Sequence, residues 1–245
     1  MFLFSLKSSI ENSGFFADSV DWHSHILPGI DDGIPTMEKA LDVLNRYEQL
    51  GISNVWLTPH IMEDIPNETS SLRERFRELT SEYHGPIHLH LASENMLDNL
   101  FEERLESDDF LPIGDSRHIL VETSYYNPPM NLHDTIDRIM KKGYQPILAH
   151  PERYVYMEMD EYKILKENNV MFQSNITSFT GIYGKDAYTK ICTFLSKGWI
   201  DLFGSDIHNL ITFNHTISDN NISKKCLHKL LVYKSFLKTN KFVFQ

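Results

Sequence analysis

The 245-residue sequence predicts a single-domain α/β fold, a distorted (β/α)7 barrel of the TIM type. Three observations favour this fold. Short apolar or β-branched runs alternate with amphipathic segments over residues 19–204, no low-complexity linker interrupts them, and three of the amphipathic segments end at a glycine, namely Gly51, Gly143 and Gly198. Repeated strand–helix units imply parallel strands with right-handed crossovers. Seven units in this length fit one barrel better than two domains.

The expected elements follow one another in a regular order. Strands are predicted at 19–23, 55–60, 87–92, 119–122, 146–150, 170–173 and 200–204. Helices are predicted at 36–50, 70–83, 131–142, 162–168 and 186–197. The first helix has Met37, Ala40 and Leu44 at helical spacing and ends at Gly51. We therefore expect an N-terminal arm over 1–18 and one domain over 19–245.

The C-terminal segment of that domain, from about residue 222, carries six lysines and no acidic residue. We interpret it as a terminal helix with a solvated basic face, packed through Leu227, Leu230, Leu231 and Phe236. A basic patch for an anionic partner is the alternative. The apolar residues of the arm, Phe2, Leu3, Phe4, Phe15 and Phe16, could cap the barrel bottom or dock on a second copy, so a homo-oligomer is possible.

Composition excludes several classes of protein. The chain has 34 acidic and 23 basic residues, a net charge of −11, which argues against a nucleic-acid-binding surface. No stretch approaches the roughly 20 apolar residues of a membrane span, and the N-terminus lacks the features of a secretory signal. Two cysteines, Cys192 and Cys226, cannot form a disulfide scaffold. We therefore expect a cytoplasmic protein without a transmembrane segment.

Histidines and carboxylates occur where the predicted strands end. They are His23 and His25 (first strand), His60 (second), Glu94 (third), Glu122 (fourth), His150 (fifth), and Asp206 and His208 (seventh), with Asp32 in the loop after the first strand. In a β/α barrel all these ends open on one face. Only the sixth strand, which ends near Gln173, offers no obvious ligand.

Each of these residues alone is weak evidence, because a lone buried histidine is more often a satisfied core residue. An HxH pair on a strand does place both imidazoles on one side. The coincidence at six of seven strands is what indicates a metal centre. Nine ligands suit two or three divalent ions, and nitrogen and oxygen ligation without thiolate suits manganese, iron or zinc. We expect manganese, with iron or zinc as alternatives.

The motifs together resemble the PHP (polymerase and histidinol phosphatase) superfamily and, within it, the bacterial CpsB/CapC-type protein tyrosine phosphatases of capsule and exopolysaccharide loci. The similar segments, in chain order over about residues 20–235, are His23-Ser-His25-Ile-Leu-Pro-Gly-Ile-Asp-Asp32-Gly, Thr58-Pro-His60, Ser93-Glu94-Asn-Met-Leu-Asp, Ile119-Leu-Val-Glu122, Ala149-His150-Pro-Glu-Arg153-Tyr and Ser205-Asp206-Ile-His208-Asn-Leu. The resemblance implies a distorted seven-stranded barrel with a trinuclear metal site.

By this resemblance the nine residues divide among three metals. One is held by His23, His25, Glu94 and Asp206; Glu94 bridges to a second with Glu122 and His150; Asp32, His60 and His208 hold the third. Arg153 binds the phosphate through its planar fork of donors. A metal-bound hydroxide attacks phosphorus, and Asp206 or a nearby histidine protonates the leaving phenolate. The implied substrate is phosphotyrosine in the tail of a bacterial tyrosine kinase.

One position departs from the subfamily pattern. A second phosphate-binding arginine is usual five residues after the last motif histidine, and Phe213 stands there. Loss of a charge-assisted contact costs about 1.5–3 kcal/mol. We therefore expect Phe213→Arg to raise activity on phosphotyrosine peptides.

Other classes of protein remain open on these residues. A weakly active or inactive metal-bound phosphotyrosine-binding regulator is one, and another PHP or amidohydrolase-like metallohydrolase is a second. Amidohydrolases commonly carry lysine where this chain has Glu122. A cysteine-dependent phosphatase is disfavoured because neither Cys192 nor Cys226 begins a phosphate-binding loop.

Overall fold

Two parallel sheets and one short antiparallel pair organise the chain in the computed structural model, which describes residues 7–114, 117–219 and 221–240. The first sheet contains β2 (Ser19–Ser24), β3 (Ile52–Leu57) and β5 (His88–Leu91). The second has, in spatial order, β10 (Leu202–Gly204), β9 (Met171–Asn175), β8 (Gln145–Ala149), β7 (His118–Glu122), β6 (Glu94–Met96) and β4 (His60–Ile61). The antiparallel pair joins β1 (Lys7–Ser8) to β11 (Ile222–Ser223).

The predicted second strand is broken in two, and the predicted third strand is followed by a separate short strand, which divides the sheet. Thr58 and Pro59 separate β3 from β4, and Ala92 and Ser93 separate β5 from β6. Proline has no N–H to donate to a ladder, so a break there has a local cause. These strands stay side by side, since Ala92 N donates to Leu57 O at 2.9 Å and Glu94 N donates to Pro59 O at 3.0 Å.

The far edges of the two sheets approach each other at β10 and β2. Asp206 N donates to His23 O at 2.8 Å. A Cβ atom at Gly204 would lie 2.5 Å from His23 Cβ, so only glycine permits this approach. The result is a curled parallel sheet whose strand ends gather on one side.

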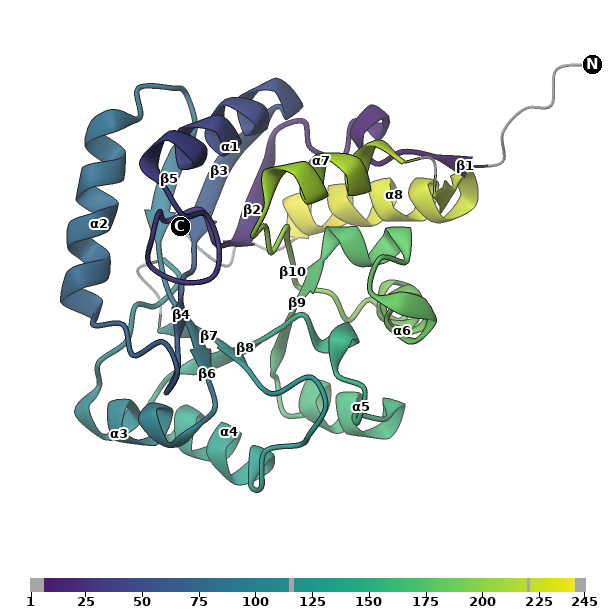
Figure 1. Cartoon of the computed structure of the whole chain (residues 1–245). Coiled ribbons are helices and arrows are strands. Elements are labelled where there is room, and N and C mark those ends of the chain that lie inside the picture. Colours follow the sequence, from purple (N-terminus) through teal and green to yellow (C-terminus); the bar gives the residue numbers. More distant parts are fainter. Residues whose placement is uncertain (1–6, 115–116, 220, 241–245) are drawn as a thin grey trace, which may run out of the picture.

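Helices lie around the outside of the strands (Figure 1). The five predicted helices are present as α1 (Met37–Leu50), α2 (Thr69–Glu82), α4 (Leu132–Lys141), α5 (Met159–Glu167) and α6 (Gly184–Lys197). Thr36 caps α1 through a bond from Lys39 N, and Gly51 ends it at φ +82°. Three further helices are α3 (Asn99–Ser107) and α7 (Leu210–Ser218), which were not predicted, and the basic α8 (Lys224–Asn240).

Side-chain alternation along the strands produces two cores. Ile119 and Val121 of β7 pack outward in the larger apolar cluster, whereas Leu120 belongs to an inner cluster with Ile147 and Trp56. A period of two is what a sheet covered on both faces requires. The apolar runs are therefore strands with two buried faces, and their polar terminal residues project beyond the packed layers.

The two ends of the described chain pack on each other. Phe15 and Phe16 of the expected arm are buried, whereas Phe2, Leu3 and Phe4 lie outside the described residues. On α8, Leu227 and Leu230 are buried as expected, but the packing expected of Phe236 is wrong, because it is 51% exposed.

The lysines of α8 do not all face solvent. Lys234 Nζ donates to Ala17 O at 2.8 Å, and Lys238 pairs with Asp18 at 2.7 Å.

Within the described ranges, no helix is long and apolar enough to cross a bilayer.

Candidate metal centre

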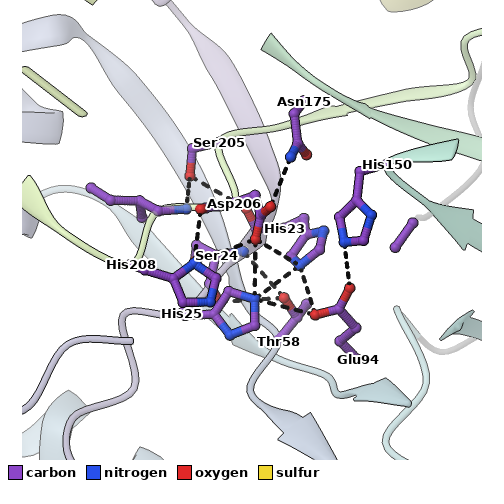
Figure 2. Close-up of polar contacts among 12 residues, drawn as sticks. His23, Ser24, His25, Thr58, Glu94, His150, Asn175, Ser205, Asp206 and His208 are labelled. Atoms are coloured by element: carbon purple, nitrogen blue, oxygen red, sulfur yellow. Dashed lines mark hydrogen bonds and ion pairs between the residues drawn. The ribbon is translucent and has the colours of Figure 1, made fainter. Parts of the chain in front are cut away.

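All nine predicted metal-ligand residues lie together at the carboxyl ends of the strands. They form four overlapping groups in which the ligand atoms lie within 4.8 Å of one another: His23, His25 and Asp206; His23, Glu94 and His150; His60, Glu94 and Glu122; and His25, Asp32, His60 and His208. Figure 2 shows His23, His25, Glu94, His150, Asp206 and His208 pointing toward one space. Residues up to 185 positions apart in sequence are thus neighbours because parallel strands end on the same side.

The HxH pair at the end of β2 forms the middle of the cluster. The Nε2 atoms of His23 and His25 are 3.0 Å apart. They lie 3.2 and 3.3 Å from Glu94 Oε2, and 3.6 and 3.4 Å from Asp206 Oδ1. The two imidazole nitrogens thus lie between Glu94 and Asp206, and with Asp206 they form one group of ligand atoms close enough to hold an ion.

A second group involves both oxygens of Glu94. His150 Nε2 lies 2.9 Å from Glu94 Oε1 and 3.7 Å from Glu122 Oε2. His60 Nδ1 lies 3.0 Å from Glu122 Oε1 and 3.1 Å from Glu94 Oε2. Glu94 thus faces both groups, which suits a carboxylate that bridges two ions.

The third group is the most open. Asp32 Oδ1 lies 3.3 Å from His208 Nε2 and 3.6 Å from His60 Nε2, and its side chain is 67% exposed. The hydrogen bond with His208 lowers the pKa of Asp32 to about 2. An ion held here would face the solvent side of the cluster.

The cluster contains buried polar atoms that lack hydrogen bonds. Within the described chain, His60 Nδ1, Glu94 Oε2, Glu122 Oε1 and His150 Nδ1 are buried without a hydrogen-bond partner. Some of these atoms are about 3 Å apart, yet their directions do not form hydrogen bonds. Unsatisfied buried polar atoms are costly, and the lone pairs of His60 Nδ1, Glu94 Oε2 and Glu122 Oε1, which lie close together, are what a cation would satisfy. The residues present therefore fit divalent metal ions.

The charges of the cluster depend on one another. Burial alone would lower the pKa of His23, but the carboxylates of Glu94 and Asp206 raise it to about 9. Burial would raise the pKa of Glu94, yet His23 and His60 hold it well below its usual value. The pKa of Asp206 is likewise depressed, chiefly by His23 and His25. Without cations, protonated imidazoles must supply the positive charge that these carboxylates need.

Two of the nine residues adopt strained backbone conformations. His150 has φ +32° and Asp206 has φ +53°. A non-glycine residue in the left-handed region costs on the order of 1–3 kcal/mol and persists only where its surroundings enforce it. Here His150 N donates to Gln173 Oε1 and Asp206 N donates to His23 O. The strained backbone conformations thus occur at two residues, His150 and Asp206, whose side chains point into the cluster.

Three buried or partly buried residues missed by the sequence reasoning orient the histidines and Asp206. Gln173 Oε1 lies 2.7 Å from His23 Nδ1, and Asp31 Oδ2 lies 2.8 Å from His25 Nδ1. Asn175 Nδ2 donates to Asp206 Oδ2 at 2.7 Å (Figure 2). Such partners fix the tautomer and orientation of metal-binding imidazoles. The sixth strand therefore serves the cluster through Gln173 and Asn175, whose i and i+2 spacing was the available signal.

Arg153 lies beside the cluster and is held on three sides. Its Nη1 donates to Asp206 Oδ2 at 2.7 Å. Its guanidinium carbon lies 4.1 Å from the ring centre of Tyr125 and 4.4 Å from that of Tyr183. Burial would lower the pKa of Arg153, but Asp206 raises it, so the side chain remains cationic. A planar cation fixed between two rings is ready to bind a bidentate anion.

A cavity of about 570 Å³ opens over these residues. Its lining includes Asp32, His60, Glu122, Arg153 and His208. Phe213 also touches it, but the Phe213 side chain is buried and its ring centre lies 5.7 Å from that of Tyr47 and 6.1 Å from that of Phe16. Position 213 is therefore part of the core beneath the cavity, which the sequence reasoning did not anticipate.

The fold and the cluster together define an α/β protein with a buried histidine–carboxylate centre that can hold several metal ions. The chain belongs to the family described as capsular polysaccharide synthesis, CpsB/CapC, whose model matches residues 19–230. This finding confirms the subfamily inferred from the motifs.

Named relatives and a solved structure agree with this membership. The chain is 28% identical over 204 residues to the tyrosine-protein phosphatase YwqE of Bacillus subtilis, covering 80% of each chain. It is 28% identical over 206 residues to the tyrosine-protein phosphatase CpsB of Streptococcus pneumoniae, covering 78% and 83%. Its fold matches, with a TM-score of 0.77 and 24% identity over 90% of this chain and 92% of the other, a structure from work on YwqE and CpsB described as unique metal-dependent tyrosine phosphatases.

Proposed function

We propose that this protein is a metal-dependent phosphatase that hydrolyses phosphotyrosine in a protein substrate. The observation that carries the proposal is the juxtaposition of nine converging ligand residues with Arg153 beside the 570 Å³ cavity. The names of the relatives support the same chemistry. The substrate we propose is the tyrosine-containing tail of a bacterial kinase of capsule or exopolysaccharide synthesis, met in the cytoplasm.

The nine residues would hold two or three ions, with manganese as the expected metal and iron or zinc as alternatives. The proposed sets are His23, His25, Glu94 and Asp206; Glu94, Glu122 and His150; and Asp32, His60 and His208. His60 also faces Glu122, so it could serve the second set. We further propose that the two sheets form the distorted seven-stranded PHP barrel, with residues 19–245 as its domain.

The bound ions would supply Lewis acidity and an activated water for attack on phosphorus. The protein's own contribution is positioning. Arg153 would bind two phosphate oxygens, and Tyr125 and Tyr183 would keep its plane fixed. Asp206 would act as a ligand that also orients Arg153. Proton donation by Asp206 to the phenolate stays a prediction, and the depressed pKa of Asp206 argues against it.

A second candidate function is a metal-bound regulator that captures phosphotyrosine without hydrolysing it. The observation that favours it is that Arg153 is the only arginine or lysine among the described residues lining the cavity. Binding would then rest on one guanidinium and the metal ions.

The two candidates are separated by one experiment. Metal-stripped protein is reloaded with Mn²⁺ and mixed with a phosphotyrosine peptide, and both peptide binding and phosphate release are measured. Release that requires the metal supports the phosphatase. Metal-dependent binding without release supports the regulator, and a full rate in excess chelator contradicts both.

A further inference from the structure

Four segments that follow strands on the cavity side carry no charged residue. They are 123–131 after β7, 154–157 between Arg153 and Glu158 after β8, 176–183 after β9, and 207–218, which follows Asp206 after β10; none contains Asp, Glu, Lys or Arg, although these residues make up 23% of the chain. Loops at a protein surface are normally polar and charged. Uncharged stretches after four neighbouring strands indicate a locally apolar surface that Arg153, Glu158 and Asp206 border.

The same segments hold most of the exposed large apolar side chains. Tyr126 (73% exposed), Met130 (98%), Val155 (53%), Ile182 (46%) and Ile211 (80%) all belong to them. Scattered apolar residues are ordinary, but a cluster beside a cavity marks a binding surface. We name these five residues the apolar rim.

Contacts join the segments of the apolar rim around the cavity. Val155 N donates to Tyr125 O at 2.9 Å, which ties the loop after β8 to the loop after β7. Arg153 lies between Tyr125 and Tyr183, which adds the loop after β9. Tyr125, Ile182 and Thr212 all line the cavity, so the rim begins where the cavity ends.

A second cavity continues this surface outward. It measures about 550 Å³ and its lining combines apolar residues such as Pro128, Met130 and Met157 with the acidic residues Asp134, Glu158 and Glu161. Thr123 and Tyr156, from the two loops, share a hydrogen bond of 2.7 Å. An extended chain leaving the first cavity along this side would meet apolar side chains of the rim together with three acidic residues, which disfavour acidic residues of the substrate.

The part of the first cavity lined by Asp32, His60 and Met62 has a different character. Asp32 in the loop after β2, and Glu63, Asp64 and Glu68 after β4, are exposed. Asp32 lines the cavity directly. Like charges repel, so this side disfavours acidic residues near a bound phosphotyrosine, whereas the apolar rim favours uncharged apolar ones.

We propose that the apolar rim is a docking surface for the residues that flank the phosphotyrosine, and that these residues are uncharged and apolar or aromatic. The inference rests on the proposed phosphatase function. We take the occupant of the rim to be an extended segment of the substrate, because the rim is continuous with the cavity. A phosphate group bound in the cavity would not reach the rim by itself.

Three peptides and one small substrate test the inference. The peptides carry one phosphotyrosine flanked by Phe and Ile, by Ser and Asn, or by Glu, and p-nitrophenyl phosphate reports on the metal centre alone. Burial of two apolar side chains predicts a kcat/KM about tenfold higher for the Phe/Ile peptide than for the Ser/Asn peptide. The Glu peptide is expected to be the poorest of the three.

Matched variants assign the preference to the rim. Met130→Ser with Ile211→Ser removes two rim side chains, and Ile164→Ser with Val232→Ser removes two exposed apolar side chains of α5 and α8. The rim variant is expected to lose the tenfold preference through KM while its p-nitrophenyl phosphate rate stays the same. The α5/α8 variant is expected to keep the preference.

The outcomes separate this inference from the proposed function. A metal-dependent rate on p-nitrophenyl phosphate with no preference among peptides, or a preference that survives in the rim variant, overturns the rim inference alone. A rim variant that changes only the oligomeric state makes the rim a contact between copies and overturns it too. No hydrolysis of any substrate by Mn²⁺-loaded protein overturns both proposals.

Discussion

Arg153 shows how much of a functional residue's role lies in the groups that hold it. Its guanidinium is bonded to Asp206 and lies between the rings of Tyr125 and Tyr183. These contacts fix the plane of the guanidinium before a substrate arrives, which lowers the entropy cost of binding phosphate. Lysine carries the same charge but cannot be fixed in this way.

Replacing Arg153 by lysine is therefore expected to lower kcat/KM on a phosphotyrosine peptide by about 10–100-fold, the loss of one bidentate charge-assisted contact. Arg117→Lys is the matched control, because Arg117 also stacks on a ring, that of Tyr144 at 4.0 Å, away from the cavity. Steady-state kinetics give kcat/KM of the two variants on the same phosphotyrosine peptide. Equal activity in both would show that the stacked guanidinium at 153 is dispensable.

At the scale of single elements, β9 orients the proposed metal ligands without supplying one. Gln173 contacts both the His23 ring and the backbone N–H of His150. We expect Gln173→Ala to weaken Mn²⁺ binding about 10–100-fold, as loss of such partners does elsewhere, with little change in folding. Isothermal titration calorimetry with Mn²⁺ measures the metal affinity of Gln173→Ala, and Gln145→Ala, at the start of the neighbouring strand β8, is the control variant. Unchanged metal affinity in a folded Gln173→Ala protein would contradict the role of β9.

The helix α7 changes the expectation for position 213. Since Phe213 packs against Phe16 and Tyr47, an arginine there would be buried among aromatic rings. We expect Phe213→Arg to lower the free energy of unfolding by about 3 kcal/mol or more rather than to raise activity. Urea unfolding of the variant and of the wild-type protein measures this difference in the free energy of unfolding. A stable variant with higher phosphotyrosine activity would restore the expectation drawn from the family pattern.

The sequence predicted the elements whose signal is local. Gly51 and Gly198 end α1 and α6 as expected, and the strand-end histidines and carboxylates converge as parallel topology requires. The short helices α3 and α7 were missed because they depend on how distant segments pack. The break at Pro59 was missed although its cause, a residue without an N–H, is local. Tyr183 became recognisable only when the chain brought it beside Arg153, whereas the spacing of Gln173 and Asn175 on one face of a strand was a signal in the sequence.

At the scale of the whole molecule, the metal centre lies at the junction of the two sheets. His23 and His25 come from the first sheet, and Glu94 and Glu122 from the second. Cations bound between them would tie the sheets together and satisfy the unpaired buried atoms. Metal binding should therefore add to the stability of the fold.

Metal removal is thus expected to lower the melting temperature. Saturation at about 100 times Kd adds about 2.7 kcal/mol per site, which corresponds to about 5–10 °C for a chain of this size. Differential scanning calorimetry of stripped and Mn²⁺-loaded protein measures the shift, with Mg²⁺, a poorer match for imidazole ligands, as the comparison. Identical melting curves would show that the cluster binds no ion under these conditions.

The most direct test of the central claim is phosphate release from a phosphotyrosine peptide by the stripped protein as Mn²⁺ is added back. The account predicts a rate near zero without metal, recovery that saturates at two or three ions per chain, and loss of that recovery in His23→Ala with His25→Ala. Equal rates in stripped and reloaded protein, or full recovery in the double variant, would contradict it.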